Sequence, residues 1–177
     1  MPKTKSKAKA KPKRTRPRTK RVTPIPDGYH SVTPYLTVRG AARAIDFYKR
    51  AFGAKELMRM PGADGKSVMH AELRIGDSII FLSDEMPGGS TRSPESLGGA
   101  SGYQYLYVKD VDATFKRAVD AGARVLMPVA DMFWGDRFGR LADPFGHEWG
   151  LSTHKEDLTP DEIARRAKAA FTGGQHA

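Results

Sequence analysis

The chain carries one pattern of residues twice. An alternating run at 33–38 is followed by an amphipathic segment that ends at Gly53, and a second run at 103–108 is followed by a similar segment that ends at Gly122. The two glycines lie 122 − 53 = 69 positions apart. Alternation is typical of a half-buried strand, and an amphipathic segment with a terminal glycine is typical of a helix. The repeat therefore predicts two copies of one structural unit.

Each copy is predicted to contain a strand, a helix and three further strands. The apolar spacing predicts helices at 40–52 and about 111–121, and strands at 33–38, 55–60, 68–75, 78–84, 103–108, 124–129, 137–142 and 147–153. We therefore expect an α+β fold of two βαβββ modules, in which helices cover one face of two curved mixed sheets and a cavity lies between the sheets. The modules span about 30–85 and 102–154 of a domain at 30–154, and a linker at 86–101 joins them.

Both ends of the chain differ in composition from this domain. The first 21 residues contain eleven of the 30 lysines and arginines and no acid, so they account for the net charge of +10. We expect residues 1–24 to be a disordered basic tail, because like charges repel and almost nothing apolar is present for burial. Residues 1–21 either keep the protein soluble or bind nucleic acid or an acidic surface without sequence specificity. A capping pattern predicts a helix at 159–171, and residues 172–177 are expected to be disordered.

The sequence also restricts the class of protein. Its 177 residues contain no cysteine, which excludes disulfides and thiolate metal sites. No apolar run approaches the ~20 residues that span a bilayer, and the N-terminus lacks the apolar region of a signal peptide. We therefore expect a cytoplasmic protein without membrane insertion.

Three motifs carry a resemblance to a known superfamily. They are Ala44-Ile45-Asp46-Phe47-Tyr48-Lys49 with Phe52-Gly53, Val108-Lys109-Asp110-Val111-Asp112-Ala113, and Gly135-Asp136-Arg137 with Asp143-Pro144-Phe145-Gly146-His147. With these motifs the region 30–154 resembles the vicinal oxygen chelate superfamily, which includes glyoxalase I, bleomycin-resistance proteins and extradiol dioxygenases. Within it, the chain looks most like the PhnB-type, glyoxalase-like subgroup. The resemblance implies paired βαβββ modules and often a dimer, but no single chemistry, because such folds host many reactions.

Metal-binding members of this superfamily place ligands at four positions. The resemblance implies that Thr33, Phe81, Tyr103 and Gly150 occupy these positions in this chain. A hydroxyl, a phenyl ring, a phenol and a glycine do not form the set of His, Gln and Glu ligands that a divalent cation needs. We therefore predict no cofactor at the usual metal site of the family.

The sheet faces opposite the helices are predicted to bind a ligand. Strand alternation gives these faces an aromatic lining with hydroxyls, formed by Thr33, Tyr35, Phe81, Tyr103, Tyr105 and Tyr107. Such a lining suits a planar or apolar small molecule, because rings supply contact area and phenols orient polar groups. The alternative is that the tyrosines pack against one another and leave little space.

An aromatic loop is predicted beside this cavity. Trp134 and Arg137 flank Gly135 there, and the loop is expected to cover the cavity with Arg137 contacting an anionic group of the ligand. Alternatively, the loop is a structural turn in which Asp136 and Arg137 pair with the backbone or with each other.

His70 and Glu72 are the candidate catalytic residues. They lie two positions apart on one strand, so both side chains project from the same face. They either form an acid/base pair, supply two ligands of a displaced metal site with Glu148 as a candidate third, or form a polar wall.

These observations lead to three hypotheses of function. The first is a glyoxalase/bleomycin-resistance-fold protein, expected to be a homodimer, that binds a small aromatic or apolar ligand without the usual metal. The second is a metal-dependent lyase, isomerase or dioxygenase with a divalent metal at a displaced site. The third is a polyanion-associated protein that its basic tail localises.

Overall fold

A computed structural model of the chain describes residues 22–173. The predicted basic tail lies almost entirely outside this range, as do the last four of the residues expected to fray at the C-terminus. Among the described residues, no helix is long and apolar enough to cross a bilayer.

The first module contains four strands and one long helix. Its elements are β1 (Tyr35–Val38), α1 (Ala41–Phe52), β2 (Lys55–Pro61), β3 (Val68–Ile75) and β4 (Ser78–Asp84). The strands form one sheet in the order β1-β4-β3-β2, in which β1 runs parallel to β4 and the other pairs are antiparallel. Gly53 ends α1 in the left-handed conformation with φ of 67°, which a glycine adopts without steric cost.

The second module repeats this arrangement. Its elements are β5 (Tyr103–Tyr107), α3 (Val111–Asp120), β6 (Arg124–Asp131), β7 (Asp136–Ala142) and β8 (Glu148–His154). The strand order is β5-β8-β7-β6, and β5 runs parallel to β8 as β1 does to β4. The predicted α+β fold of two βαβββ modules is therefore confirmed, with two separate mixed sheets that do not close into one barrel.

Two further helices lie outside the modules. A single turn, α2 (Pro94–Leu97), interrupts the linker, and α4 (Pro160–Gly173) follows the second module. The short α2 was not predicted, although Ser93 accepts a hydrogen bond from the Ser96 amide as an N-cap and Pro94 occupies the first turn. A helix of four residues has no apolar period, so alternation and spacing cannot detect it.

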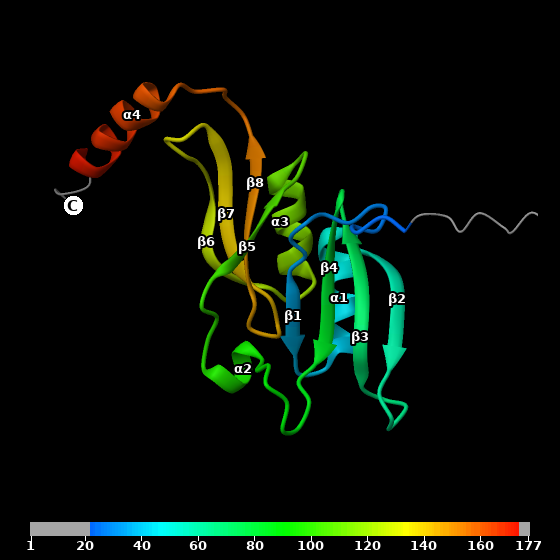
Figure 1. The fold of residues 1–177 in the computed structure, drawn as a ribbon. Coiled ribbons are helices and arrows are strands. Elements are labelled where there is room, and N and C mark those ends of the chain that lie inside the picture. The colour runs from blue at the N-terminus through cyan, green and yellow to red at the C-terminus, as the bar shows by residue number, and fades with distance from the viewer. Residues whose placement is uncertain (1–21, 174–177) are drawn as a thin grey trace, which may run out of the picture.

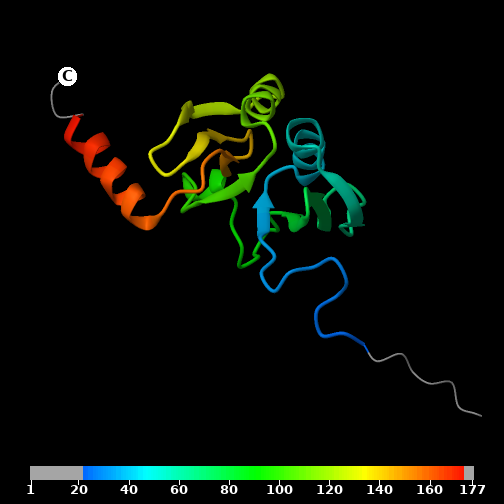
Figure 2. The same cartoon turned by 90° about the horizontal axis from the view of Figure 1, so that it is seen from above.

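The helices and sheets form two layers. Figures 1 and 2 show the two sheets side by side with α1 and α3 together on one side of them, and these two helices pack against each other. We call the opposite side of both sheets the open face. Residues 22–34, here called the strap, precede β1 and pass over the open-face side of the first sheet (Figure 2).

The core joins the two modules through aromatic rings. Tyr48 and Phe52 of α1 contact Trp149 of β8, with ring centroids 5.4 and 4.7 Å apart. Phe47 of α1 contacts Phe145, which follows β7, at 6.4 Å. All five side chains are buried, so the first helix shares its apolar surface with the second module.

Asp143 satisfies the polar groups of this core. Its Oδ2 accepts hydrogen bonds from the Tyr48 hydroxyl at 2.7 Å and from Nε1 of Trp149 at 3.0 Å. Its Oδ1 accepts from the amides of Phe145 and His147, both at 2.9 Å. The carboxylate is 5% exposed and therefore depends on these four donors in place of water. Burial and the adjacent carboxylate raise the pKa of Tyr48 well above its usual range, so Tyr48 remains a hydrogen-bond donor.

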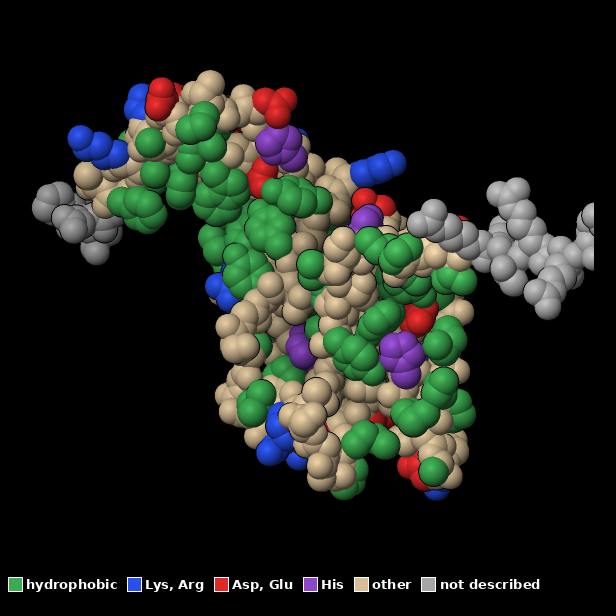
Figure 3. Space-filling view, viewed as in Figure 1, with side chains coloured by type: hydrophobic (Ala, Val, Ile, Leu, Met, Phe, Trp, Pro, Cys, Tyr) green, Lys and Arg blue, Asp and Glu red, His purple; other side chains and the backbone are tan. Residues whose placement is uncertain are grey.

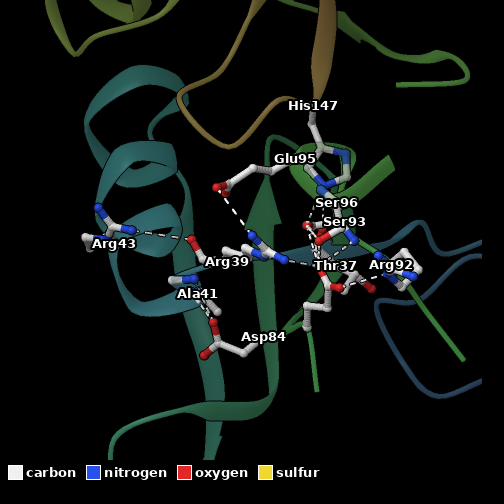
Figure 4. Close-up of polar contacts among 12 residues, drawn as sticks. Thr37, Arg39, Ala41, Arg43, Asp84, Arg92, Ser93, Glu95, Ser96 and His147 are labelled. Carbon is white, nitrogen blue, oxygen red and sulfur yellow. Dashed lines mark hydrogen bonds and ion pairs between the residues drawn. The ribbon is translucent and has the colours of Figure 1, made fainter. Parts of the chain in front are cut away.

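Two polar contacts fix the first strand and helix (Figure 4). Asp84 at the end of β4 accepts hydrogen bonds of 2.8 Å from the amides of Gly40 and Ala41, and these bonds cap the N-terminus of α1. Nε2 of His147, from the turn before β8, lies 2.9 Å from the carbonyl oxygen of Thr37 in β1. This second contact holds β1 next to the second module.

The linker is held by a carboxylate at the end of β4. Glu85 accepts hydrogen bonds from the hydroxyls of Ser93 and Ser96, at 2.5 and 2.6 Å, and from Arg92 at 2.9 Å. These bonds lower the pKa of Glu85 to about 2, so it stays ionised at neutral pH. The linker is therefore fixed at α2 rather than extended along its whole length.

The Tyr48–Asp143 contact should be essential to stability. Tyr48→Phe removes one of four donors from a buried carboxylate, and we expect it to lower the free energy of unfolding by about 1.5–3 kcal/mol. Urea unfolding followed by circular dichroism measures the loss. The control is Tyr35→Phe, since Tyr35 is half exposed and its change should stay below ~0.5 kcal/mol. Equal losses in the two variants would show that the Asp143 contact has no special role.

Candidate functional site

A groove lies between the two sheets. It has a volume of about 470 Å³, within the range of small-molecule sites. One wall is β5, and the other is formed by the strap and the turn between β3 and β4. The lining residues include Tyr103, Tyr105 and Tyr107 on the first wall and His30, Val32, Pro34 and Ile79 on the second. The predicted cavity between the sheets is thus present, at the side of β5.

Three tyrosines of β5 dominate the groove. Alternation turns Tyr103, Tyr105 and Tyr107 to the same face, where they are 43%, 41% and 63% exposed. Tyr105 lies 6.3 Å from Tyr103 and 5.0 Å from Tyr107, measured between ring centroids. Hydrophobic side chains gather over this sheet in Figure 3. The rings contact one another, as the alternative interpretation expected, yet they keep a large free surface.

The aromatic surface continues across the second sheet. Tyr105 stacks on Phe138 of β7 with an interplanar angle of 14° and a separation of 5.3 Å. The ring of Trp134 meets Phe138 edge-on at 5.7 Å. Trp134 therefore extends the tyrosine surface, but it lies beyond the residues that line the groove, which the predicted aromatic loop was expected to cover.

A buried acid supports this surface from within. Asp136 of β7 accepts hydrogen bonds from the Tyr105 hydroxyl at 3.0 Å and from the Ser152 hydroxyl at 2.8 Å. Nδ1 of His154 lies 2.8 Å from the same carboxylate, and Nε2 of His154 lies 3.0 Å from Asp157. The imidazole is thus held between two carboxylates at the end of β8.

The protonation states follow from these contacts. Burial opposes ionisation of Asp136, but the hydrogen bonds from His154, Ser152 and Tyr105 outweigh it and keep the pKa of Asp136 below its ordinary value. The hydrogen bonds to Asp157 and Asp136 raise the pKa of His154. Burial, together with Asp136, raises the pKa of Tyr105 to about 12. At neutral pH the cluster therefore holds an ionised Asp136 and a neutral phenol at Tyr105.

The sequence analysis missed this cluster. It considered Asp136 only as a partner of Arg137 and did not single out Ser152 or His154. A signal was present, because strand alternation places Ser152 and His154 on one face of β8 and the register pairs Asp136 with His154. Using that signal requires knowing that β7 pairs with β8 and in which register, and the order of elements in the chain does not give this information.

The open face of the first sheet carries the predicted acid/base pair. Nε2 of His70 lies 3.5 Å from Oε1 of Glu72, and the Tyr35 hydroxyl lies 3.1 Å from Nδ1 of His70. The ring of Phe81 meets those of His70 and Tyr35 edge-on, at 4.9 and 5.7 Å. Four of the predicted site residues therefore form one cluster. Thr33 precedes β1, and its neighbours Val32 and Pro34, rather than Thr33 itself, line the groove.

The expected role of Arg137 is wrong. Arg137 forms two hydrogen bonds of 2.7 Å with Asp112 of α3 and one of 3.2 Å with Asp131. These partners draw it to the helix side of the sheet, away from the open face. Arg140, three positions later on β7, lies on the open face of the second sheet, 4.5 Å from the centre of the Tyr103 ring, and binds Glu148. An odd separation along a strand puts the two arginines on opposite faces.

The residues at the four positions that the resemblance assigns to metal ligands do not form a set that suits a metal. A Cβ atom built at Gly150 would lie 2.7 Å from Phe138 and 2.8 Å from Tyr103, so rings fill the space of a ligand there. Glu148, the candidate third ligand of a displaced site, belongs to the other sheet from His70 and Glu72 and binds Arg140. Across residues 22–173, no three His, Cys, Asp or Glu side chains are grouped so that they could hold a metal ion.

The His154 contacts predict a pH dependence. Because its pKa is raised, protonated His154 stabilises the fold fully below its ordinary value of 6.5, and this stabilisation is lost as the pH rises through the raised value. We expect the difference in Tm between the wild type and His154→Gln to be largest near about pH 6 and to shrink by about pH 9. His30→Gln, at an exposed position, is the control. A difference that grows with pH would contradict the assignment.

Comparisons with known proteins agree with this architecture. A model of the Glyoxalase/Bleomycin resistance protein/Dioxygenase superfamily matches residues 28–151. The uncharacterised protein Mb0911c of Mycobacterium bovis is 48% identical over 136 residues, which cover 75% of this chain and 89% of that protein. The X-ray structure of the Arabidopsis thaliana product At5g48480 is 31% identical with a TM-score of 0.55, covering 70% of this chain and 98% of that one.

A PhnB protein from Bacillus cereus shares the fold. It has a TM-score of 0.55 at 20% identity and covers 70% of this chain and 99% of its own. The resemblance to the vicinal oxygen chelate superfamily and its PhnB-type members is therefore confirmed at the level of the fold. Since the family model spans more than half of the sequence, the chain belongs to the Glyoxalase/Bleomycin resistance protein/Dioxygenase superfamily.

Proposed function

We propose that the protein binds a small aromatic or apolar molecule in the groove between its sheets, without the metal that many members of the superfamily use. The observation that carries the proposal is the wall of three part-exposed tyrosines along a groove of about 470 Å³. Exposed rings at this density are costly in water and gain free energy when another ring covers them.

The groove sets the character of the ligand. Val32, Pro34 and Ile79 face the tyrosine wall, so a ligand meets apolar groups on both sides. A planar molecule suits the space between two such walls. The phenol hydroxyls of Tyr103 and Tyr107 and the imidazole of His30 supply a few polar contacts that can orient it.

The cluster behind Tyr105 supports this role. Asp136 and Phe138 hold the Tyr105 ring from two directions, one through its hydroxyl and one through its face. A ring fixed in this way loses little side-chain entropy when a ligand binds. The wall is therefore preorganised for binding rather than formed by it.

The tyrosine wall can be tested by substitution. We expect indole, a two-ring planar probe, to bind the wild type and to bind Tyr107→Ala about 5- to 30-fold more weakly, the loss typical of one aromatic contact. Tyr107→Phe should retain most of the affinity, because the ring and not the hydroxyl provides the contact. Ligand-detected NMR and calorimetric titration measure both effects.

The matched control lies on the helix side. Val119 is part exposed on α3, and Val119→Ala should leave indole binding unchanged. Indole affinity that is equal in the wild type and Tyr107→Ala would place binding elsewhere and end the groove proposal.

We also propose that the protein is a homodimer that uses β2. This edge strand of the first sheet exposes Leu57, Met58 and Met60, while its outer backbone groups have no strand partner within residues 22–173. An exposed apolar edge strand favours pairing with another strand, and a second copy of the chain supplies one by two-fold symmetry.

Sedimentation velocity tests the dimer. We expect twice the monomer mass for the wild type and a monomer for Met58→Lys, because a buried unpaired lysine destabilises an interface strongly. Lys66→Met, in the turn between β2 and β3, is the control and should remain dimeric. A monomeric wild type at about 0.1 mM, well above the Kd expected of a stable dimer, would disprove the proposal.

A further inference from the structure

The strap places a tyrosine on the open face of the first sheet. The Tyr29 hydroxyl donates a hydrogen bond to Oε2 of Glu72, and its ring centroid lies 6.2 Å from that of Phe81. Tyr29 thus contacts two members of the His70, Glu72, Tyr35 and Phe81 cluster from the solvent side. This contact joins residues 43 positions apart in the chain.

A tight turn presents this ring to the sheet. The amide of Tyr29 donates to the carbonyl of Pro26 at 3.1 Å, which closes a four-residue turn. Gly28 has a φ of 85°, the left-handed conformation that the third residue of a type II turn requires. The sequence Pro26-Asp27-Gly28 therefore fixes the direction in which Tyr29 leaves the strap.

The rest of the strap is weakly held. Val22, Ile25 and Val32 are 87%, 48% and 81% exposed. Among the hydrogen bonds of residues 22–173, those that tie the strap to the sheet are the Tyr29 hydroxyl to Glu72 and the Phe81 amide to the carbonyl of Pro34. The second bond lies at the start of β1, so Tyr29 is the anchor of the free part of the strap.

The surface beneath Tyr29 has the features of a binding site for a ring with a hydroxyl. Phe81, His70 and Tyr35 supply aromatic surface, and the part-buried carboxylate of Glu72 supplies a charged acceptor. The hydrogen bond to Glu72 raises the pKa of Tyr29, which remains a neutral donor at physiological pH. A phenol is the group that this surface binds in the structure.

We propose that the open face of the first sheet is a binding site for phenolic ligands, and that Tyr29 occupies it in the free protein. A phenol in solution would place its ring on Phe81, donate its hydroxyl to Glu72 and displace the strap. This site lies on β3 and β4 and shares the strap with the groove at β5, so p-cresol and indole test the two sites with different probes. It gives His70 and Glu72 a substrate class, since Glu72 accepts the hydroxyl of the bound phenol and Nε2 of His70 lies 3.5 Å from the other oxygen of that carboxylate.

The side chain of tyrosine itself provides the probe. p-Cresol has the same ring and hydroxyl as Tyr29, and 4-methylanisole has the same ring but cannot donate a hydrogen bond. Tyr29 competes for the site, so removing Tyr29 should increase the affinity for p-cresol. The increase grows with the fraction of molecules in which Tyr29 occupies the site. In calorimetric titration, we expect Tyr29→Ala to bind p-cresol at least ~10-fold more tightly than the wild type does. We expect the same variant to bind 4-methylanisole ~10-fold more weakly than p-cresol.

A second substitution identifies the acceptor. In the double variant Tyr29→Ala, Glu72→Leu, the preference for p-cresol over 4-methylanisole should disappear, because the carboxylate that accepts the hydroxyl is absent. Tyr29→Ala, Tyr107→Ala is the matched control: it alters the groove and should retain the preference. Equal p-cresol affinity in the wild type and Tyr29→Ala would overturn the proposal, as would a preference that survives Glu72→Leu.

The wild-type protein allows an independent test of the phenol site. Saturating p-cresol should shift the amide signals of residues 27–30 and 70–72 together in the nitrogen–proton NMR spectrum, as the strap leaves the sheet. If instead only residues 103–107 respond, the phenol binds in the groove, so that the phenol site is disproved while the groove remains a ligand site. If residues 70–72 respond to p-cresol but no residue responds to indole, the phenol site is supported and the groove is disproved as a ligand site.

Discussion

The buried carboxylate of Asp143 is the interaction on which the arrangement of the two modules depends. It binds the hydroxyl of Tyr48 from the first module and the indole of Trp149 and two turn amides from the second. A buried carboxylate left without donors is strongly destabilising, so the helix and the turn must meet at one place. That requirement positions α1 against β8, and β8 in turn positions β5 and its tyrosines beside the strap.

The open faces of the two sheets have diverged although their backbones repeat. In the first sheet, Tyr35 pairs in register with Phe81 and supports an acid and an imidazole, while in the second, Tyr105 pairs with Gly150. The missing side chain at Gly150 gives room to the rings of Tyr103 and Phe138, so aromatic packing fills this position. One backbone plan thus carries an acidic, hydrogen-bonding face and a mainly aromatic face.

The sequence predicted the fold well because the fold depends on local patterns that occur twice. Alternation and helical spacing located β3 and α1, and the same alternation put Tyr103, Tyr105 and Tyr107 on one face. Arg137 was misplaced because it was treated as part of the aromatic loop, whereas it lies within β7, which begins at Asp136. Contacts such as Tyr29 with Glu72 and His154 with Asp136 depend on how distant segments meet, which a local pattern does not encode.

The separation of the sheets has a mechanical consequence. Within residues 22–173, β1 and β5 belong to different sheets and share no strand pairing. The distance between the walls of the groove therefore depends on the other contacts between the modules, among them the packing of α1 on α3. The groove and the helix pair lie on opposite sides of the sheets. A substitution between the helices that moved one sheet relative to the other would therefore change the width of the groove without altering any residue that lines it.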